Sequence, residues 1–158
     1  MSDPKEILER RLDDVAEKQD TRGLHFFLQI GGHDDPNGLT TLQIAGSGWT
    51  LLSWKRPDDT ELYSVELGQA DLVKFYMLLR QHPFWDASPV RRKREEGETN
   101  IHMRFADQAK GTYSALQFWD GDIDEFPVLG YLLEPLVKLV RLISNDEIPL
   151  LTVQKKAS

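Results

Sequence analysis

The sequence contains no cysteine among its 158 residues. This absence excludes disulfide bonds, thiolate nucleophiles, iron–sulfur clusters held by cysteine and zinc sites of the cysteine type. The sequence also lacks an apolar run of the roughly 20 residues that a membrane-spanning helix needs. Residues 1–6 are largely charged or polar, without the apolar stretch of a signal peptide. We therefore expect a soluble, cytoplasmic protein.

Positive charge is scarce relative to negative charge. Lysine and arginine number 19 against 26 acidic residues, so the formal net charge is −7 and the pI is near 5.1. This charge disfavours general attraction to nucleic acid and anionic membranes, because neutralised phosphates supply most non-specific affinity. With 40% hydrophobic and 28% charged residues, the composition is typical of a globular protein, and the length suits a single domain over 1–158.

The motifs of common enzyme classes are missing as well. No Gly-x-Ser-x-Gly turn occurs to present a nucleophilic serine. The glycine-rich segments 31–32 and 46–48 lack the lysine of a phosphate-binding loop. From the sequence we expect no catalytic residue set, no metal site and no cofactor, which favours a protein that is not an enzyme.

Three segments have the apolar spacing of helices. The first lies between Asp3, a helix-capping residue followed by proline, and Gly23. The second spans residues 69–82. The third spans residues 125–145 and is apolar on most sides, which predicts a buried helix. Pro135 inside it removes one backbone hydrogen bond and predicts a kink or a split.

Six further segments alternate between apolar and polar residues with the period of two that is typical of strands. They are residues 24–30, 39–45, 49–55, 60–67, 99–107 and 112–119. Short turns join the first four to one another and the last two, which favours antiparallel pairing. The order α-ββββ-α-ββ-α predicts an α+β fold with one antiparallel sheet and all helices on one face. Residues 148–153 resemble a short additional edge strand.

Residues 86–98 are rich in charge and almost free of apolar side chains, so we predict a mobile loop. The basic run Arg91–Arg94 within this loop has enough charge to contact phosphates. Three acidic residues follow it directly, and no aromatic residue lies within it to stack on bases. Nucleic-acid contact through Arg91–Arg94 is therefore the weakest functional hypothesis.

The densest acidic cluster consists of Asp120, Asp122 and Asp124. Alternating carboxylates invite a calcium site, but an EF-hand loop needs glycine at its sixth position and glutamate at its twelfth. The sequence has Glu125 and Tyr131 there. We therefore favour carboxylates that cap backbone amides, or an acidic rim that attracts a basic protein partner.

Two histidines, one arginine and two tryptophans are the remaining site candidates. His25 and His102 lie on the polar sides of their strands, with Arg104 beside His102. If the strands are neighbours, these three side chains could converge on a small ligand or supply a catalytic base. Trp49 and Trp54 are an odd number of residues apart, so one of them belongs to the face that the helices leave open. Aromatic side chains on such a face are typical anchors of protein interfaces.

The leading hypothesis is a small, acidic, non-catalytic binding protein of the inhibitor, immunity or adaptor type. It would recognise another protein, a basic one being favoured, through the exposed sheet face or the acidic rim. The alternative is a small-ligand binder or enzyme that uses His25, His102 and Arg104. The sequence leaves open whether the chain associates with itself, and in which order the strands pair.

Overall fold

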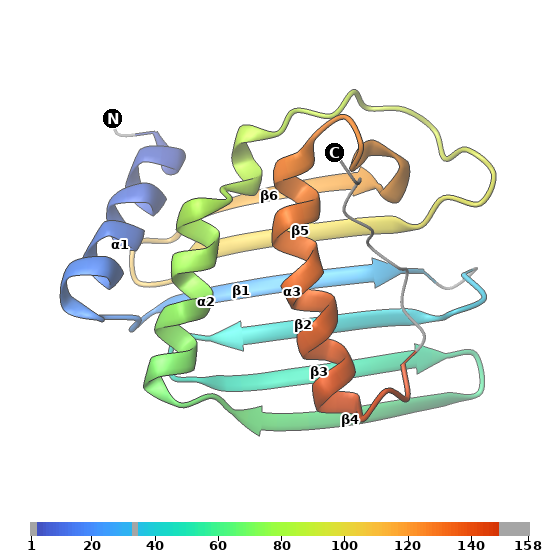
Figure 1. Cartoon of the computed structure of the whole chain (residues 1–158), viewed down its shortest axis with the longest axis horizontal. Coiled ribbons are helices and arrows are strands. Elements are labelled where there is room, and N and C mark those ends of the chain that lie inside the picture. The colour runs from blue at the N-terminus through green and yellow to red at the C-terminus, as the bar shows by residue number, and fades with distance from the viewer. Residues whose placement is uncertain (1–2, 33–34, 149–158) are drawn as a thin grey trace.

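The computed structural model describes residues 3–32 and 35–148 (Figure 1). The predicted α+β class and the element order α-ββββ-α-ββ-α are both confirmed. The elements are α1 Pro4–Lys18, β1 Leu24–Gly31, β2 Leu39–Ala45, β3 Trp49–Arg56, β4 Asp59–Glu66, α2 Gln69–Gln81, β5 Asn100–Asp107, β6 Thr112–Trp119 and α3 Pro127–Ser144, with short 3-10 turns η1 Phe84–Asp86 and η2 Asp120–Asp122.

One six-stranded sheet contains all these strands, in the order β4-β3-β2-β1-β5-β6, and every neighbouring pair is antiparallel. The first four strands form a meander that ends at β4. The β5–β6 hairpin is added on the other side of β1, where Phe27 lies opposite both Gln43 of β2 and Arg104 of β5. Strand β1 is therefore in the interior of the sheet, and β4 and β6 are its edges.

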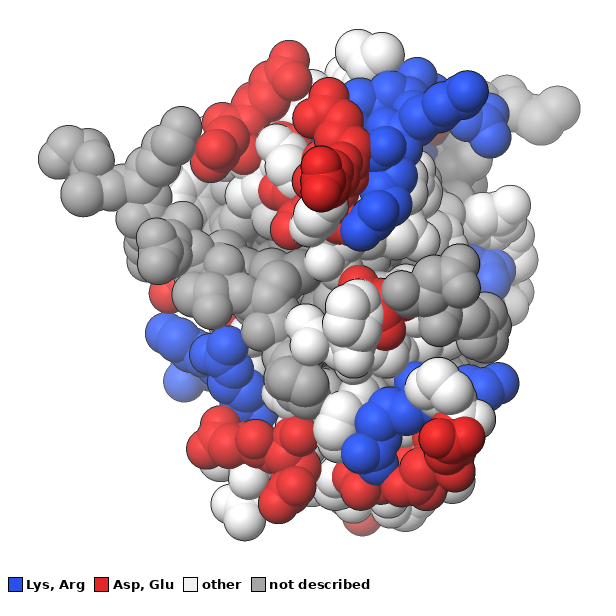
Figure 2. Space-filling model, turned by 90° about the vertical axis from the view of Figure 1, so that its right-hand side faces the viewer, with Lys and Arg blue, Asp and Glu red and all other residues white. Residues whose placement is uncertain are grey.

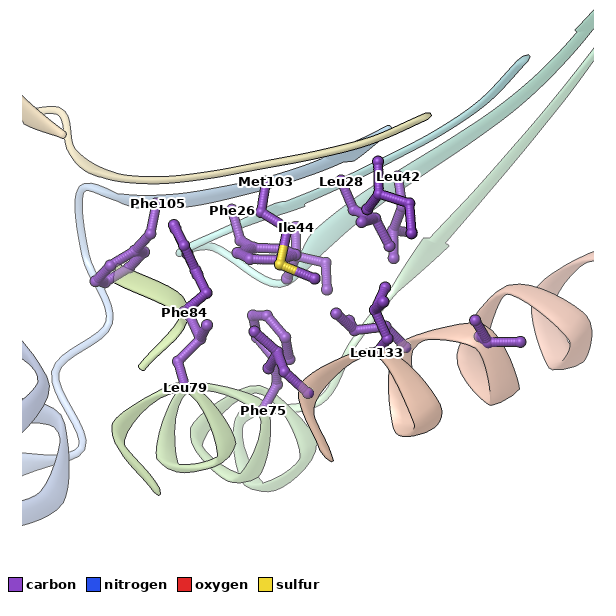
Figure 3. Close-up of a cluster of buried hydrophobic side chains, with 14 of the residues drawn as sticks. Phe26, Leu28, Leu42, Ile44, Phe75, Leu79, Phe84, Met103, Phe105 and Leu133 are labelled. Carbon is purple, nitrogen blue, oxygen red and sulfur yellow. The ribbon is translucent and has the colours of Figure 1, made fainter. Parts of the chain in front are cut away.

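All three helices lie on one side of the sheet (Figure 1). The core fills the space between the two layers, because every second strand residue points toward the helices. Figure 3 shows this contact between sheet residues and residues of α2, η1 and α3. The labelled side chains are Phe26, Leu28, Leu42, Ile44, Met103 and Phe105 from the sheet and Phe75, Leu79, Phe84 and Leu133 from the helical layer, and all are buried.

Helix α3 is not split at Pro135, which excludes one of the two predicted outcomes, and it is less buried than predicted. It continues from Pro127 to Ser144 with Pro135 inside it, so the chain is not split there. It is also amphipathic rather than buried all round, because Leu142 is 78% exposed while Leu133 is fully buried. Its buried face packs over the sheet, and its outer face meets solvent.

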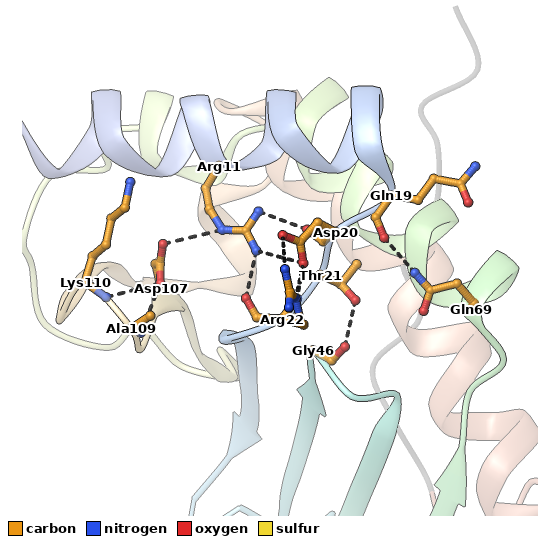
Figure 4. Close-up of polar contacts among 10 residues, drawn as sticks. All are labelled: Arg11, Gln19, Asp20, Thr21, Arg22, Gly46, Gln69, Asp107, Ala109 and Lys110. Atoms are coloured by element: carbon orange, nitrogen blue, oxygen red, sulfur yellow. Dashed lines mark hydrogen bonds and ion pairs between the residues drawn. The ribbon is translucent and has the colours of Figure 1, made fainter.

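A buried arginine, Arg11, holds helix α1 at the sheet (Figure 4). The helical pattern of the sequence identifies this residue only as polar. Arg11 donates to the carbonyl oxygens of Asp20 at 2.9 Å and Arg22 at 2.7 Å. Its Nε lies 3.6 Å from the carboxylate of Asp107, which is itself buried at the end of β5. Asp107 also accepts from the amides of Ala109 and Lys110. These contacts join α1 to the β5–β6 turn.

No helix within the described ranges, 3–32 and 35–148, is long and apolar enough to cross a bilayer. The predicted strand 148–153 lies outside the described residues, except for Ile148, which is buried in the core.

Candidate functional site

The side of the sheet opposite the helices carries side chains that line up in rows, because the register has no bulge between neighbouring strands. Three of these rows are called the outer face here. From β4 to β6, the first row is Glu66, Trp49, Ala45, His25, Ala106 and Tyr113; the second is Ser64, Leu51, Gln43, Phe27, Arg104 and Ala115; the third is Leu62, Ser53, Thr41, Gln29, His102 and Gln117.

A fourth row lies beyond the third, at the end of the sheet where the Trp119 indole donates to the Arg92 carbonyl of the loop 86–98. It consists of Thr60, Lys55, Leu39, Gly31, Asn100 and Trp119. Lys55 gives this row one charge, and its members Gly31, Asn100 and Trp119 line a hollow of about 480 Å³ together with Gln117 of the third row.

The outer face is depleted of charge. Only Glu66 on β4 and Arg104 on β5 carry a permanent charge, although charged residues make up 28% of the chain. Burial lowers the pKa of His25 and of His102 below the ordinary 6.5, and the charge of Arg104 lowers both further. Both imidazoles are therefore neutral at neutral pH, and the outer face is close to uncharged.

Apolar side chains are exposed on the half of the outer face formed by β3 and β4. Trp49 is 49% exposed, Leu51 42% and Leu62 77%. Together with polar neighbours of β2, β3 and β4, they line a shallow hollow of about 450 Å³. Contiguous exposed apolar surface of this kind marks interaction sites in soluble proteins.

The other half, formed by β1, β5 and β6, carries rings and one cation. The Phe27 and His102 rings meet edge to face, with centroids 5.8 Å apart. The Arg104 guanidinium lies over the Tyr113 ring, 4.4 Å from its centroid. This cation–π contact directs Arg104 from the second row toward the first, where Tyr113 lies.

The two histidines share the outer face but do not converge. Strands β1 and β5 are neighbours, as the hypothesis required. However, His25 lies opposite Ala106 and His102 lies opposite Gln29, a separation of four residues along the strands. At about 3.3 Å per residue this is about 13 Å, with Arg104 in the row between them. The two imidazoles therefore cannot act on one atom.

The predicted separation of the two tryptophans onto opposite faces is confirmed. Trp49 is on the outer face, whereas Trp54 points to the core and is 7% exposed. The Trp54 indole Nε1 donates to the Asn37 carbonyl at 2.8 Å, and the Arg56 guanidinium covers its ring at 3.9 Å. Trp54 is thus a structural residue, and Trp49 is the tryptophan that is exposed for contact with a partner.

The acidic cluster caps backbone amides, including that of Trp119 at the start of the 3-10 turn η2, although none at the start of α3. Asp120 accepts from the Thr99 amide at 2.8 Å, and buried Asp122 accepts from the Trp119 amide at 2.9 Å. Helix α3 begins without a side-chain cap. Asp122 also pairs with Arg92 at 3.0 Å, so two of the three aspartates hold strand ends and the loop instead of forming a rim. Asp124 is exposed.

The basic run in the loop 86–98 is partly committed to internal contacts. Arg92 binds both carboxylate oxygens of Glu98 at 2.6 Å, and the Arg94 Nε donates to the Glu98 carbonyl at 2.7 Å. Arg92 holds the pKa of Glu98 at about 2. Figure 2 shows basic and acidic side chains next to one another on this side of the molecule. The second half of the loop is therefore anchored, and the mobility of 86–98 stays a prediction.

Leu51 and Leu62 were not predicted from the sequence to be surface residues. The available signal was parity: Leu51 is two residues after Trp49, so both share a face of β3. No group of three metal-ligating side chains that could hold an ion occurs among the described residues. No protein-family model matches the sequence, and a search of curated proteins finds none similar to it.

Proposed function

We propose that this chain is a non-catalytic interaction protein that recognises another protein through the outer face of its sheet. The observation that carries the proposal is the charge-depleted outer face with Trp49, Leu51 and Leu62 exposed on it. Depletion of charge and enrichment of aromatic residues distinguish the centre of protein interfaces from ordinary surface. An inhibitor, an immunity-type protein or an adaptor works in this way, by contact alone.

Other ligand classes have less support. The near-neutral face offers phosphates little attraction, which disfavours nucleic acid. The hollow over β2–β4 is half open to solvent, whereas small-molecule sites enclose most of their ligand. Separation of His25 from His102 removes the acid–base pair that an enzyme would need there. Since Asp120 and Asp122 bind backbone amides, the acidic rim contributes less to recognition than the sheet face.

We place this activity in the cytoplasm, because a chain without cysteine cannot form the disulfide bonds that stabilise proteins of oxidising compartments.

A capture experiment tests the proposal. The tagged full chain is compared with the double variant Leu51→Lys/Leu62→Lys, which adds two charges to the outer face. Leu142→Lys is the matched control, because Leu142 is equally apolar and exposed but lies on α3. Proteins bound by the wild type are identified, and the best of them is purified and titrated.

We expect the double variant to weaken binding of the purified partner at least about tenfold, because charges at a desolvated interface centre are costly. The control should bind like the wild type. Equal affinity of the double variant and the wild type would contradict a role for the outer face.

A further inference from the structure

The two halves of the outer face are complementary to each other across β2, and we propose that a second copy of the same chain docks on it, face to face, about a two-fold axis along β2. This inference rests on the proposed function, because it assigns an occupant to the same face. An interface of this symmetry uses one patch twice, so each contact occurs in duplicate.

The strand order fixes which strands face each other. A two-fold axis parallel to β2 reverses the order β4-β3-β2-β1-β5-β6. It therefore places β4 over the partner's β5, β3 over the partner's β1, and β2 over the partner's β2. The rows are kept, since rotation about an axis along the strands does not move residues along them. Two sheets packed face to face in this way form an aligned sandwich about 10 Å apart.

The two charges of the outer face meet in this arrangement. Glu66 is its only acid and lies on β4, in the first row. Arg104 is its only permanent base and lies on β5, which is the strand that faces β4 of the other copy. Its guanidinium lies over Tyr113 of β6, which is in the same first row as Glu66 and one strand beyond the position that faces the partner's Glu66. The symmetry therefore produces two identical ion pairs from the two charges of the outer face.

The uncharged side chains match as well. In the second row, Leu51 faces the partner's Phe27, so the most central apolar residue meets an aromatic ring. In the first row, Trp49 faces the partner's His25, and in the third row Leu62 faces the partner's His102. These pairs place the exposed apolar half of one copy on the ring-bearing half of the other. Gln43 lies on the axis, where two amide side chains can bond each other.

The area is sufficient for a weak dimer. Five overlapping strands about 4.8 Å apart and three rows about 7 Å apart span roughly 24 by 20 Å, or about 480 Å² of each copy. This is below the roughly 600–1,000 Å² per partner of standard specific interfaces and within the range of weak, transient ones. The dimer should therefore depend on protein concentration in the range accessible to sedimentation.

Sedimentation velocity of the full chain, from about 1 µM to about 300 µM, gives the dissociation constant of the dimer directly. Glu66→Arg and Arg104→Glu each place like charges opposite one another, and each should raise this constant at least about tenfold. Glu17→Arg is the control, with the same charge change on the exposed side of α1.

An equimolar mixture of the two variants should restore dimers. In the mixed dimer, the arginine introduced at position 66 of one variant faces the glutamate introduced at position 104 of the other. The second contact of the mixed dimer joins the native Arg104 of the first variant to the native Glu66 of the second, so both contacts are attractive again.

Circular dichroism and thermal melting confirm that the variants fold, as expected for exposed side chains. Unchanged association of either single variant, or a mixture that stays monomeric, would overturn the proposed register. A wild-type chain that is monomeric throughout would overturn the second copy as occupant. A monomeric wild type would not contradict the proposed function. That proposal fails only if Leu51→Lys/Leu62→Lys binds its protein partner with the affinity of the wild type.

Discussion

Replacement of Arg11 by methionine tests how α1 is held at the sheet. Arg11 is 7% exposed and is the cation beside Asp107, which is 1% exposed. Methionine fills most of the vacated volume but donates no hydrogen bond. The substitution leaves Asp107 with the two backbone amides of the β5–β6 turn, and it removes a donor from the carbonyls of Asp20 and Arg22.

Removing one partner of a buried ion pair costs about 3–5 kcal/mol, because an uncompensated charge stays behind. The Arg11–Asp107 atoms are 3.6 Å apart, and two amides still solvate the carboxylate, so the lower end applies. We expect a loss of about 3 kcal/mol in the free energy of unfolding. For a chain of this size that corresponds to a fall in Tm of about 6–12 °C.

Urea unfolding followed by far-ultraviolet circular dichroism measures this loss. Arg10→Met is the matched control, since Arg10 is exposed on the same helix, and it should stay within about 0.5 kcal/mol of the wild type. Adding Asp107→Asn to Arg11→Met should recover part of the loss, because the stranded charge is removed. A loss below about 1 kcal/mol, or further destabilisation by Asp107→Asn, would refute the reasoning.

Three further predictions concern pH and the core. Because burial lowers the pKa of His25 and His102, protonation favours the unfolded chain, so the free energy of unfolding should be constant above about pH 6.5 and fall below it. In urea titrations at several pH values, the double variant His25→Gln/His102→Gln should show a smaller fall. The pKa of Glu98 is about 2 in the folded chain against an ordinary 4.5, so this carboxylate contributes stability that is present above pH 4.5 and lost as the pH falls toward 2. Glu98→Gln should therefore reduce Tm at pH 7 and remove this part of the dependence of Tm on pH. Leu133→Asp should unfold the chain, as judged by circular dichroism, because a buried unpaired carboxylate costs several kcal/mol, whereas Leu142→Asp should melt like the wild type.

Local periodicity was enough to predict the elements, their order and the antiparallel sheet. It could not predict where β5 and β6 join the sheet. Phe27 and Arg104 are opposite each other across an intervening meander and helix, and no local pattern records that pairing. The helix α3 was predicted as too deeply buried, because its apolar composition does not show that Leu142 lies beyond the edge of the core.

Site residues were predictable where parity decides and unpredictable where distant segments meet. The opposite faces of Trp49 and Trp54 follow from an odd spacing along one strand. In contrast, Asp122 is neutralised by Arg92, 30 residues away, and nothing near either residue indicates the other. The distance between His25 and His102 likewise depends on a register between strands that the sequence does not specify.

The proposed function depends on one claim, that another protein molecule covers the outer face when the chain performs its function in the cell. Hydroxyl-radical footprinting read by mass spectrometry tests it by comparing the oxidation of Trp49 in cells with that of the dilute purified chain. Tyr131 is the internal reference, because it is 49% exposed, like Trp49, but lies on α3. We predict that Trp49 is protected several-fold in cells while Tyr131 is not. Equal oxidation of Trp49 in both samples, or protection of Tyr131 alone, would contradict the claim.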